Sequence, residues 1–114
     1  MQIRHHDWLG ILEESGLVEF TKVEVDANGI YRANLVINGD YVKEPKTFFP
    51  KDWSRKKVVE KIIESLKNLV NEPELRANGK WRITGKTTEG IHIRTIINPI
   101  KNKIETSYPI FETE

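Results

Sequence analysis

Cysteine is absent from this sequence of 114 residues. A chain without cysteine has no disulfide framework, no thiolate zinc site and no thiol nucleophile. Long apolar runs are also absent, since none approaches the ~20 residues that a membrane-spanning helix needs. The first residues, MQIRHHDWLG, contain no apolar signal-peptide core. We therefore expect no disulfide and no membrane association, and a cytoplasmic place of work fits both expectations.

A strong net charge is missing as well. The sequence has 18 Lys and Arg against 17 Asp and Glu, which gives a net charge of +1 at pH 7. This balance argues against binding through overall charge, but it leaves room for a local basic cleft. Hydrophobic residues make up 38% of the chain, as in an ordinary globular protein. The length is that of a typical domain, so we expect a single domain over residues 1–114.

Several catalytic motifs are also lacking. The sequence has no His-Glu-x-x-His, no Gly-rich phosphate loop and no Gly-x-Ser-x-Gly element. Its three histidines include no pair at the helical i, i+4 spacing of a zinc site. We therefore predict neither a metal nor another cofactor. The carboxylates are dispersed, which does not favour chemistry by a facing pair of acids.

The hydrophobic pattern predicts an α+β fold. Residues 6–16 have apolar positions at helical spacing and end at a glycine, which predicts a short N-terminal helix. Alternating segments separated by turn residues predict strands at 17–25, 30–37, from 41 onward, 80–87, 91–97 and 103–111. The connections are too short for parallel crossovers, so we expect mostly antiparallel sheets.

A second helix is expected over residues 54–70, SRKKVVEKIIESLKNLV. Asp52 and Ser54 are both suitable N-cap residues. One face is apolar and the other is charged. The apolar face consists of Val58, Val59, Ile62, Ile63, Leu66, Leu69 and Val70. We therefore expect the sheets to pack against this one long amphipathic helix and the short N-terminal helix.

The stretch TFFPKDWS, residues 47–54, concentrates aromatic bulk where the chain turns. Pro50 prevents continued strand pairing. The stretch therefore forms the corner between a sheet and the helix, and residues 71–79 form a connector after it. We expect Phe48, Phe49 and Trp53 to pack where the helix meets the sheet.

The remaining chemistry is acid–base catalysis by histidine with a cationic partner. Attack of a ribose 2′-hydroxyl on the adjacent phosphate of RNA needs a general base and a general acid. A lysine can stabilise the charge that develops on the phosphoryl oxygens. Histidine suits both proton transfers because its pKa lies near neutrality. Tyrosine and threonine can hold a phosphate or stack a base.

The segment PKTFFPKDWSRKKVVEKIIESL, residues 45–66, resembles the signature of the bacterial EndoU-like nuclease domain. The hairpin sequence at 26–37 is similar to the one that precedes this signature in the family. Residues 79–111 are similar to the family's closing region, with a Gly/Trp segment, a T-x-x-G-I turn and a final T-x-Y-P strand. The resemblance covers roughly residues 26–111.

The resemblance implies an EndoU-like fold and a metal-independent RNA endonuclease. Such a domain cleaves single-stranded RNA and leaves 2′,3′-cyclic phosphate ends. It is often the C-terminal toxin domain of a larger secreted or contact-delivered bacterial protein. The implied place of action is the cytoplasm of a target cell, and the implied partners are RNA and a cognate immunity protein, with no membrane.

The resemblance also implies site residues. Thr106 and Tyr108 match the family's pair on the closing strand, and residues two apart share one face of a strand. The family's lysine falls just before the aromatic signature, where Lys43 and Lys46 are both candidates and the spacing slightly favours Lys43.

The histidines follow the family pattern only in part. His5 and His6 stand where the family's second histidine is expected, without its glycines, and no room remains upstream for the first. His92 is expected at an exposed strand position. Three explanations fit this pattern and stay open: a truncated domain without its first histidine, a divergent nuclease that uses His5 or His6 with another acid, and an inactive relative that binds RNA or a protein.

Overall fold

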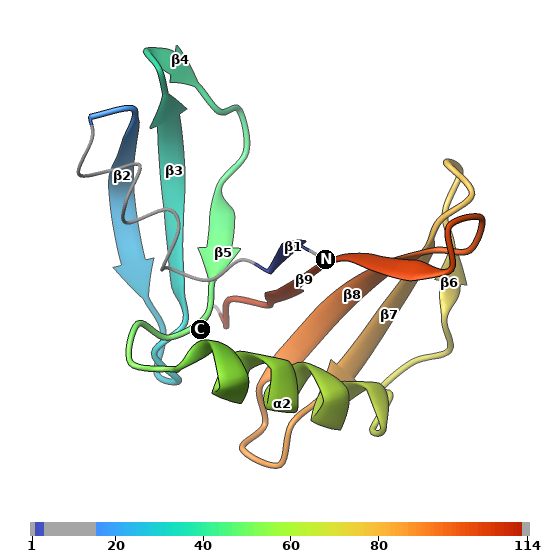
Figure 1. The fold of residues 1–114 in the computed structure, drawn as a ribbon. Helices are drawn as coiled ribbons and strands as arrows, with labels where there is room; N and C mark the ends of the chain where they lie inside the picture. Colours follow the sequence, from blue (N-terminus) through green and yellow to red (C-terminus); the bar gives the residue numbers. More distant parts are fainter. Residues whose placement is uncertain (1, 4–15, 113–114) are drawn as a thin grey trace.

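The computed structural model describes residues 2–3 and 16–112, which form two β-sheets and one helix (Figure 1). The elements are β1 (Gln2–Ile3), β2 (Val18–Val25), β3 (Tyr31–Ile37), β4 (Asp40–Tyr41), β5 (Lys46–Phe48), α2 (Arg55–Leu66), β6 (Glu74–Leu75), β7 (Trp81–Lys86), β8 (His92–Asn98) and β9 (Lys103–Pro109).

The smaller sheet is an antiparallel β2–β3 hairpin with two short strands on the far edge of β3. Of these, β4 pairs with the end of β3 and β5 pairs with its beginning. The β2–β3 turn is built by Asp26, whose Oδ1 accepts hydrogen bonds from the backbone N–H groups of Asn28 and Ile30. Gly29 has a φ of 84°, which glycine adopts without steric cost.

The larger sheet has the strand order β1-β9-β8-β7-β6. Strand β1 is parallel to β9, and the other pairs are antiparallel. The register slips by one residue between β8 and β9 after Ile96. Such a bulge bends the strand and increases its local twist.

The helix α2 begins at the cap provided by Ser54, whose Oγ accepts a hydrogen bond from the backbone N–H of Lys57 at 3.1 Å. It packs on the larger sheet, where Ser65 lies against the backbone of Gly85. A side chain at position 85 would collide with the carbonyl oxygen of Ser65. The close approach of helix and strand therefore depends on a glycine.

The prediction of a long helix over residues 54–70 is wrong, because α2 ends at Leu66. The residues beyond it bond to the edge of β7 instead. Val70 N donates to Thr84 O at 3.1 Å, and Lys86 N donates to Asn68 O at 3.0 Å. The edge of β7 offers backbone groups that residues 68–70 can pair with. Pairing with this edge ends the helix, although the apolar spacing of residues 66–70 is still helical.

The other half of the helical prediction, the short N-terminal helix at 6–16, lies outside the described residues except for Gly16. In the part that the structure describes, α2 is the single helix and the rest is mostly antiparallel sheet. No helix there is long and apolar enough to cross a membrane. Over the described residues, the predicted packing against one long helix is therefore corrected to two mostly antiparallel sheets with one short helix.

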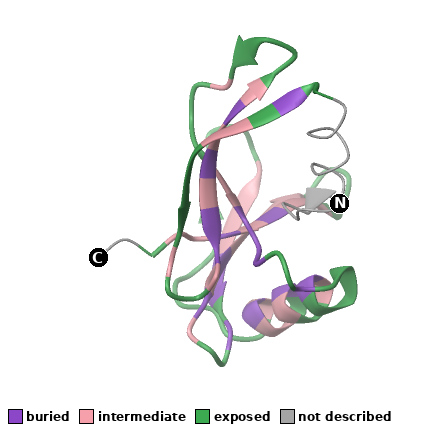
Figure 2. Cartoon of the chain, turned by 90° about the vertical axis from the view of Figure 1, so that its left-hand side faces the viewer, coloured by how far each residue is buried: buried purple, intermediate pink, exposed green. Residues whose placement is uncertain are grey.

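Two hydrophobic clusters divide the interior. Figure 2 marks buried residues on the strands and on the helix. The first cluster lies under α2 and contains Ile30, Phe49, Trp53, Val58, Ile62, Ile91 and Ile93. The second lies on the smaller sheet and contains Val18, Tyr31, Leu35 and Phe48. Phe48 and Phe49 are neighbours in sequence and enter different clusters, so the aromatic corner joins both cores rather than filling one gap.

Candidate functional site

The two sheets meet where β5 passes the end of β9. The hydroxyl of Thr47 donates a hydrogen bond of 2.7 Å to the carbonyl oxygen of Pro109. These residues are 62 positions apart in the sequence. We call this contact the sheet junction, and it sets the distance between a strand of each sheet.

The segment after β9 reinforces the sheet junction. The guanidinium of Arg32 lies 4.3 Å from the centre of the Phe111 ring, a cation–π contact. The backbone N–H of Glu112 donates to Asp26 Oδ2 at 3.0 Å. Residues 109–112 are therefore attached to the smaller sheet at three points.

Lys46 directly precedes Thr47, and Tyr108 directly precedes Pro109, the two residues joined by the junction bond. Lys46 is half-buried at the start of β5, and Tyr108 is half-buried on β9. Standard backbone dimensions limit the separation of their Cα atoms to roughly 15 Å. That separation is compatible with both side chains reaching one phosphodiester. The side chain of Lys46 leaves β5 on the face opposite that of Thr47.

Lys43 has different surroundings. It is exposed in the loop between β4 and β5, three residues before Lys46. Neither lysine forms an ion pair with a carboxylate in the part of the chain described here. The hydrogen-bonded ladder of β5 holds the backbone of Lys46 opposite Ala33, whereas Lys43 precedes that ladder.

Thr106 and Tyr108 lie on one face of β9, opposite Ile96 and Arg94 of β8. Between them, Ser107 points to the other face, where its hydroxyl is 2.9 Å from that of Thr95. Both of those hydroxyl groups are buried and satisfy each other. Ser107 therefore stabilises the sheet on one face of β9, whereas the predicted site residues Thr106 and Tyr108 lie on the other face.

His5 and His6 lie outside the described residues. His92 is half-buried rather than exposed, and its Nδ1 lies 3.3 Å from a carboxylate oxygen of Glu112. In the part of the chain that is described, no group of three or more His, Asp or Glu side chains could hold a metal ion.

Residues that the sequence prediction did not name occupy the same face as Tyr108. Arg94 is directly opposite Tyr108, and Thr84 is directly opposite Arg94 on β7. Arg82 lies two residues before Thr84 on β7, so it is on the same face. The alternation of Ile91, Ile93 and Thr95 with His92 and Arg94 could have indicated this face from the sequence.

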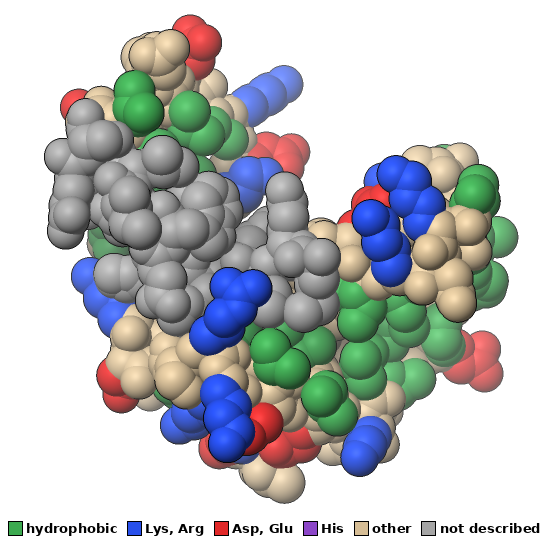
Figure 3. Space-filling view, in the orientation of Figure 1, with side chains coloured by type: hydrophobic (Ala, Val, Ile, Leu, Met, Phe, Trp, Pro, Cys, Tyr) green, Lys and Arg blue, Asp and Glu red, His purple; other side chains and the backbone are tan. Residues whose placement is uncertain are grey.

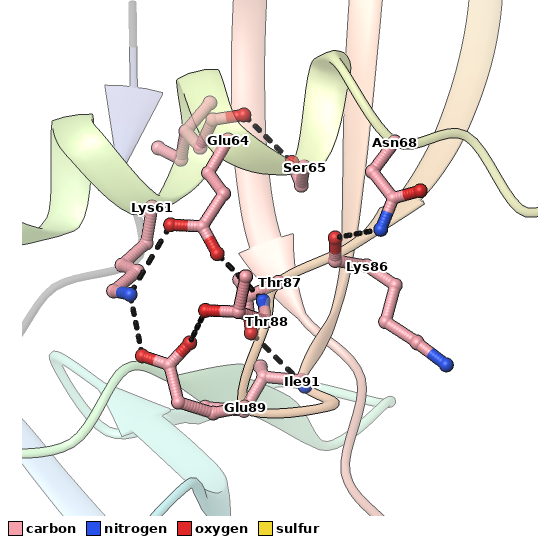
Figure 4. A network of polar contacts seen from close by, with 10 residues as sticks. Lys61, Glu64, Ser65, Asn68, Lys86, Thr87, Thr88, Glu89 and Ile91 are labelled. Atoms are coloured by element: carbon pink, nitrogen blue, oxygen red, sulfur yellow. Dashed lines mark hydrogen bonds and ion pairs between the residues drawn. The ribbon is translucent and has the colours of Figure 1, made fainter.

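On the helix side, an ionic network attaches the β7–β8 turn to α2 (Figure 4). Lys61 bonds to Glu64 and Glu89, and Glu64 also accepts a hydrogen bond from the backbone of Thr88. The hydrogen bond from Lys61 lowers the pKa of Glu89 to about 2. The bond from Thr88 lowers the pKa of Glu64, and the bond to Glu89 raises the pKa of Lys61. This network is structural, because it lies across the sheet from Tyr108.

An open apolar pocket of about 340 Å³ lies near the residues that follow α2. It is lined by Pro73, Trp81, Ile83 and Ile97. Apolar side chains gather beside α2 on the face of the molecule shown in Figure 3. None of these four residues has a side chain that titrates near neutral pH, so the pocket offers no group for acid–base chemistry.

Comparison with known proteins identifies a family and a similar protein. The model of the family described as bacterial EndoU nuclease matches residues 10–111. A protein named "Toxin" from Bacillus cereus (strain ATCC 14579) is 33% identical over 100 residues, which cover 82% of this chain and 16% of that protein. The chain therefore spans about a sixth of the length of this relative. No solved structure matches.

Proposed function

Because the chain belongs to the bacterial EndoU nuclease family, we propose that this nuclease toxin domain cleaves single-stranded RNA without a metal. The 2′-hydroxyl attacks the adjacent phosphorus and the bond to the 5′ oxygen breaks. The products are a 2′,3′-cyclic phosphate and a free 5′-hydroxyl. The reaction needs a proton removed at the 2′ oxygen and a proton delivered at the 5′ oxygen.

In this proposal His5 or His6 performs one of the two proton transfers. Lys46 or Lys43 stabilises the charge on the phosphoryl oxygens as the phosphorus becomes five-coordinate. Thr106 binds the phosphate through its hydroxyl, and Tyr108 holds the neighbouring base or phosphate.

The sheet junction is the observation that best supports this proposal. It brings the strand that begins with Lys46 to the strand that carries Tyr108, although the sequence separates them by about half the chain. Of the two lysines, the junction favours Lys46, because Lys43 lies in the exposed loop before β5. Preorganised donors on rigid elements stabilise developing charge more effectively than mobile ones.

The relative named "Toxin" supports a further proposal about where the domain works. The domain is delivered as part of a longer secreted or cell-surface protein and acts in the cytoplasm of a target cell. A producing cell then needs an immunity protein that binds this domain and blocks it.

The proposal is tested by incubating the purified chain with a fluorescent single-stranded RNA, with and without EDTA. The control is a variant in which His5 and His6 are both alanine. We expect cleavage to cyclic-phosphate ends that EDTA does not prevent and that falls at least ~100-fold in the variant, because general acid–base catalysis contributes 10²–10⁴-fold.

Two results would contradict the proposal. Cleavage that stops in EDTA would indicate a metal-dependent nuclease. A folded chain that leaves RNA intact would indicate a non-catalytic module, and binding assays with RNA and candidate protein partners would then follow.

A further inference from the structure

The larger sheet has a second face, turned away from α2, which we call the outer face. On the helix side, neighbouring strands place Gly85, Ile93 and Pro109 in one row. The next row across the sheet is on the outer face. It consists of Thr84 on β7, Arg94 on β8 and Tyr108 on β9, each adjacent in sequence to a residue of the first row. Because strand residues alternate between faces, Arg94 stands beside Tyr108 on the proposed RNA side of the sheet.

Arg94 is a half-buried cation that no described carboxylate neutralises. In the part of the chain that the structure describes, no carboxylate pairs with it, and its buried Nε has no hydrogen-bond acceptor. A buried donor left without an acceptor and a cation left without an anion are both unfavourable. An anion that reached this guanidinium would relieve both.

Arg82, on the neighbouring strand, has the same unsatisfied Nε but not the same lack of an anion. Its Nε is also buried without an acceptor, although its Nη2 bonds to Glu74 at 2.8 Å. Arg82 lies opposite Ile96, so it is a diagonal neighbour of Arg94 across the β7–β8 pair. Diagonal neighbours are within reach of each other's long side chains. Two cationic side chains within such reach attract an anion more strongly than one does.

The arginines and the neighbouring tyrosine together indicate the kind of anion. A guanidinium presents a planar fork of donors that matches two oxygens of a carboxylate or a phosphate. The adjacent Tyr108 has an aromatic ring, and single-stranded RNA is held by bases stacked on such rings next to bound phosphates.

We propose that Arg94, assisted by Arg82, binds a backbone phosphate of the RNA next to the nucleotide held by Tyr108. This inference rests on the proposed function, since it extends the RNA path along the outer face of β8 and β7. The contact is independent of base identity, because it is made to the backbone. Arg82 contributes less than Arg94, because Glu74 already neutralises part of its charge.

The test measures binding of a short fluorescent RNA in which every ribose is 2′-O-methylated, so that no 2′-hydroxyl attack is possible. We expect Arg94→Gln to weaken binding about tenfold or more, equally for different base sequences. The dependence of log Kd on log salt should lose about 0.7 of its slope, as for one lost phosphate contact on a single strand. Arg82→Gln should have a smaller effect.

Two further variants serve as controls. Arg55→Gln makes the same chemical change at an exposed residue of α2, on the other side of the sheet, and should bind like the wild type. Arg94→Lys keeps the charge but loses the fork, so it should bind more weakly with an unchanged salt slope. This variant also answers the question if Arg94→Gln fails to fold by circular dichroism.

The outcomes separate this inference from the proposed function. If the wild type cleaves RNA and both Arg94 variants bind the analogue normally, the inference is wrong and the nuclease proposal stands. If the wild type binds without cleaving and the Arg94 variants weaken binding, the inference is upheld and the nuclease proposal fails. If the wild type neither binds nor cleaves RNA, both are overturned.

Discussion

Lys43 and Lys46 show how three positions change the environment of a residue. Lys46 begins a strand that is hydrogen-bonded to β3 and that touches β9 through the next residue. Lys43 precedes that strand in an exposed loop. A lysine that stabilises a transition state must be held near the phosphate, so the two positions differ in what they can contribute.

We predict that Lys46→Ala lowers kcat for RNA cleavage by about 100-fold or more, as for the loss of an electrostatic donor. Lys43→Ala makes the same change in charge and serves as the matched control, with an effect of about tenfold or less. Single-turnover cleavage assays with both variants measure the difference. The reverse order would show that the loop lysine, which the spacing in the sequence favours, is the functional one.

At the scale of elements, α2 and the β7–β8 turn are connected by the network of Lys61, Glu64 and Glu89. The pKa of Glu89 lies at about 2 in the folded chain, below its ordinary value of 4.5. A lowered carboxyl pKa contributes stability that is present above pH 4.5 and is lost as the pH falls towards 2. The pKa of Lys61 is raised above 10.5, so its contribution is present below that pH and is lost above it.

We predict that Lys61→Met lowers the free energy of unfolding at pH 7 by about 1 kcal/mol, a value reduced for the partial solvent exposure of Glu89. The difference from the wild type should disappear between pH 4.5 and 2. Urea unfolding at several pH values measures it. Lys56→Met, at an exposed position of the same helix, should have no comparable effect, and a difference that persists at pH 2 would mean that packing, not charge, is lost.

At the scale of the whole molecule, contacts between residues far apart in the sequence fix one sheet relative to the other. The first hydrophobic cluster contacts both sheets, because Ile30 and Phe49 adjoin the smaller sheet and Ile93 belongs to the larger one. The junction bond between Thr47 and Pro109 then sets the position of β5 against β9. Activity should therefore be more sensitive to this bond than stability is.

We predict that Thr47→Val, which keeps the shape and removes the hydroxyl, costs about 1 kcal/mol of stability. Cleavage should fall further, by about tenfold or more, because small displacements of catalytic groups reduce rates strongly. Thr47→Ser keeps the donor and should retain most of the activity. Equal activity in Thr47→Val and the wild type would show that the junction does not position the site.

The sequence by itself determined the local features of this protein. Asn28–Gly29 marks the turn of the β2–β3 hairpin, and Ser54 caps α2. The aromatic signature beginning at Thr47 and the T-x-Y-P strand indicated the nuclease family that the comparison identifies. These features depend on residues close in sequence, whose conformational preferences and spacing are visible in the sequence itself.

Only the tertiary structure decided where distant segments meet. The edge of β7 ends α2 at Leu66, although the apolar spacing continues to residue 70. Phe48 and Phe49 enter different cores, and Arg94 comes to stand beside Tyr108. Such outcomes depend on backbone pairing and packing between segments far apart in the chain, and the energies of those contacts have no local signature in the sequence.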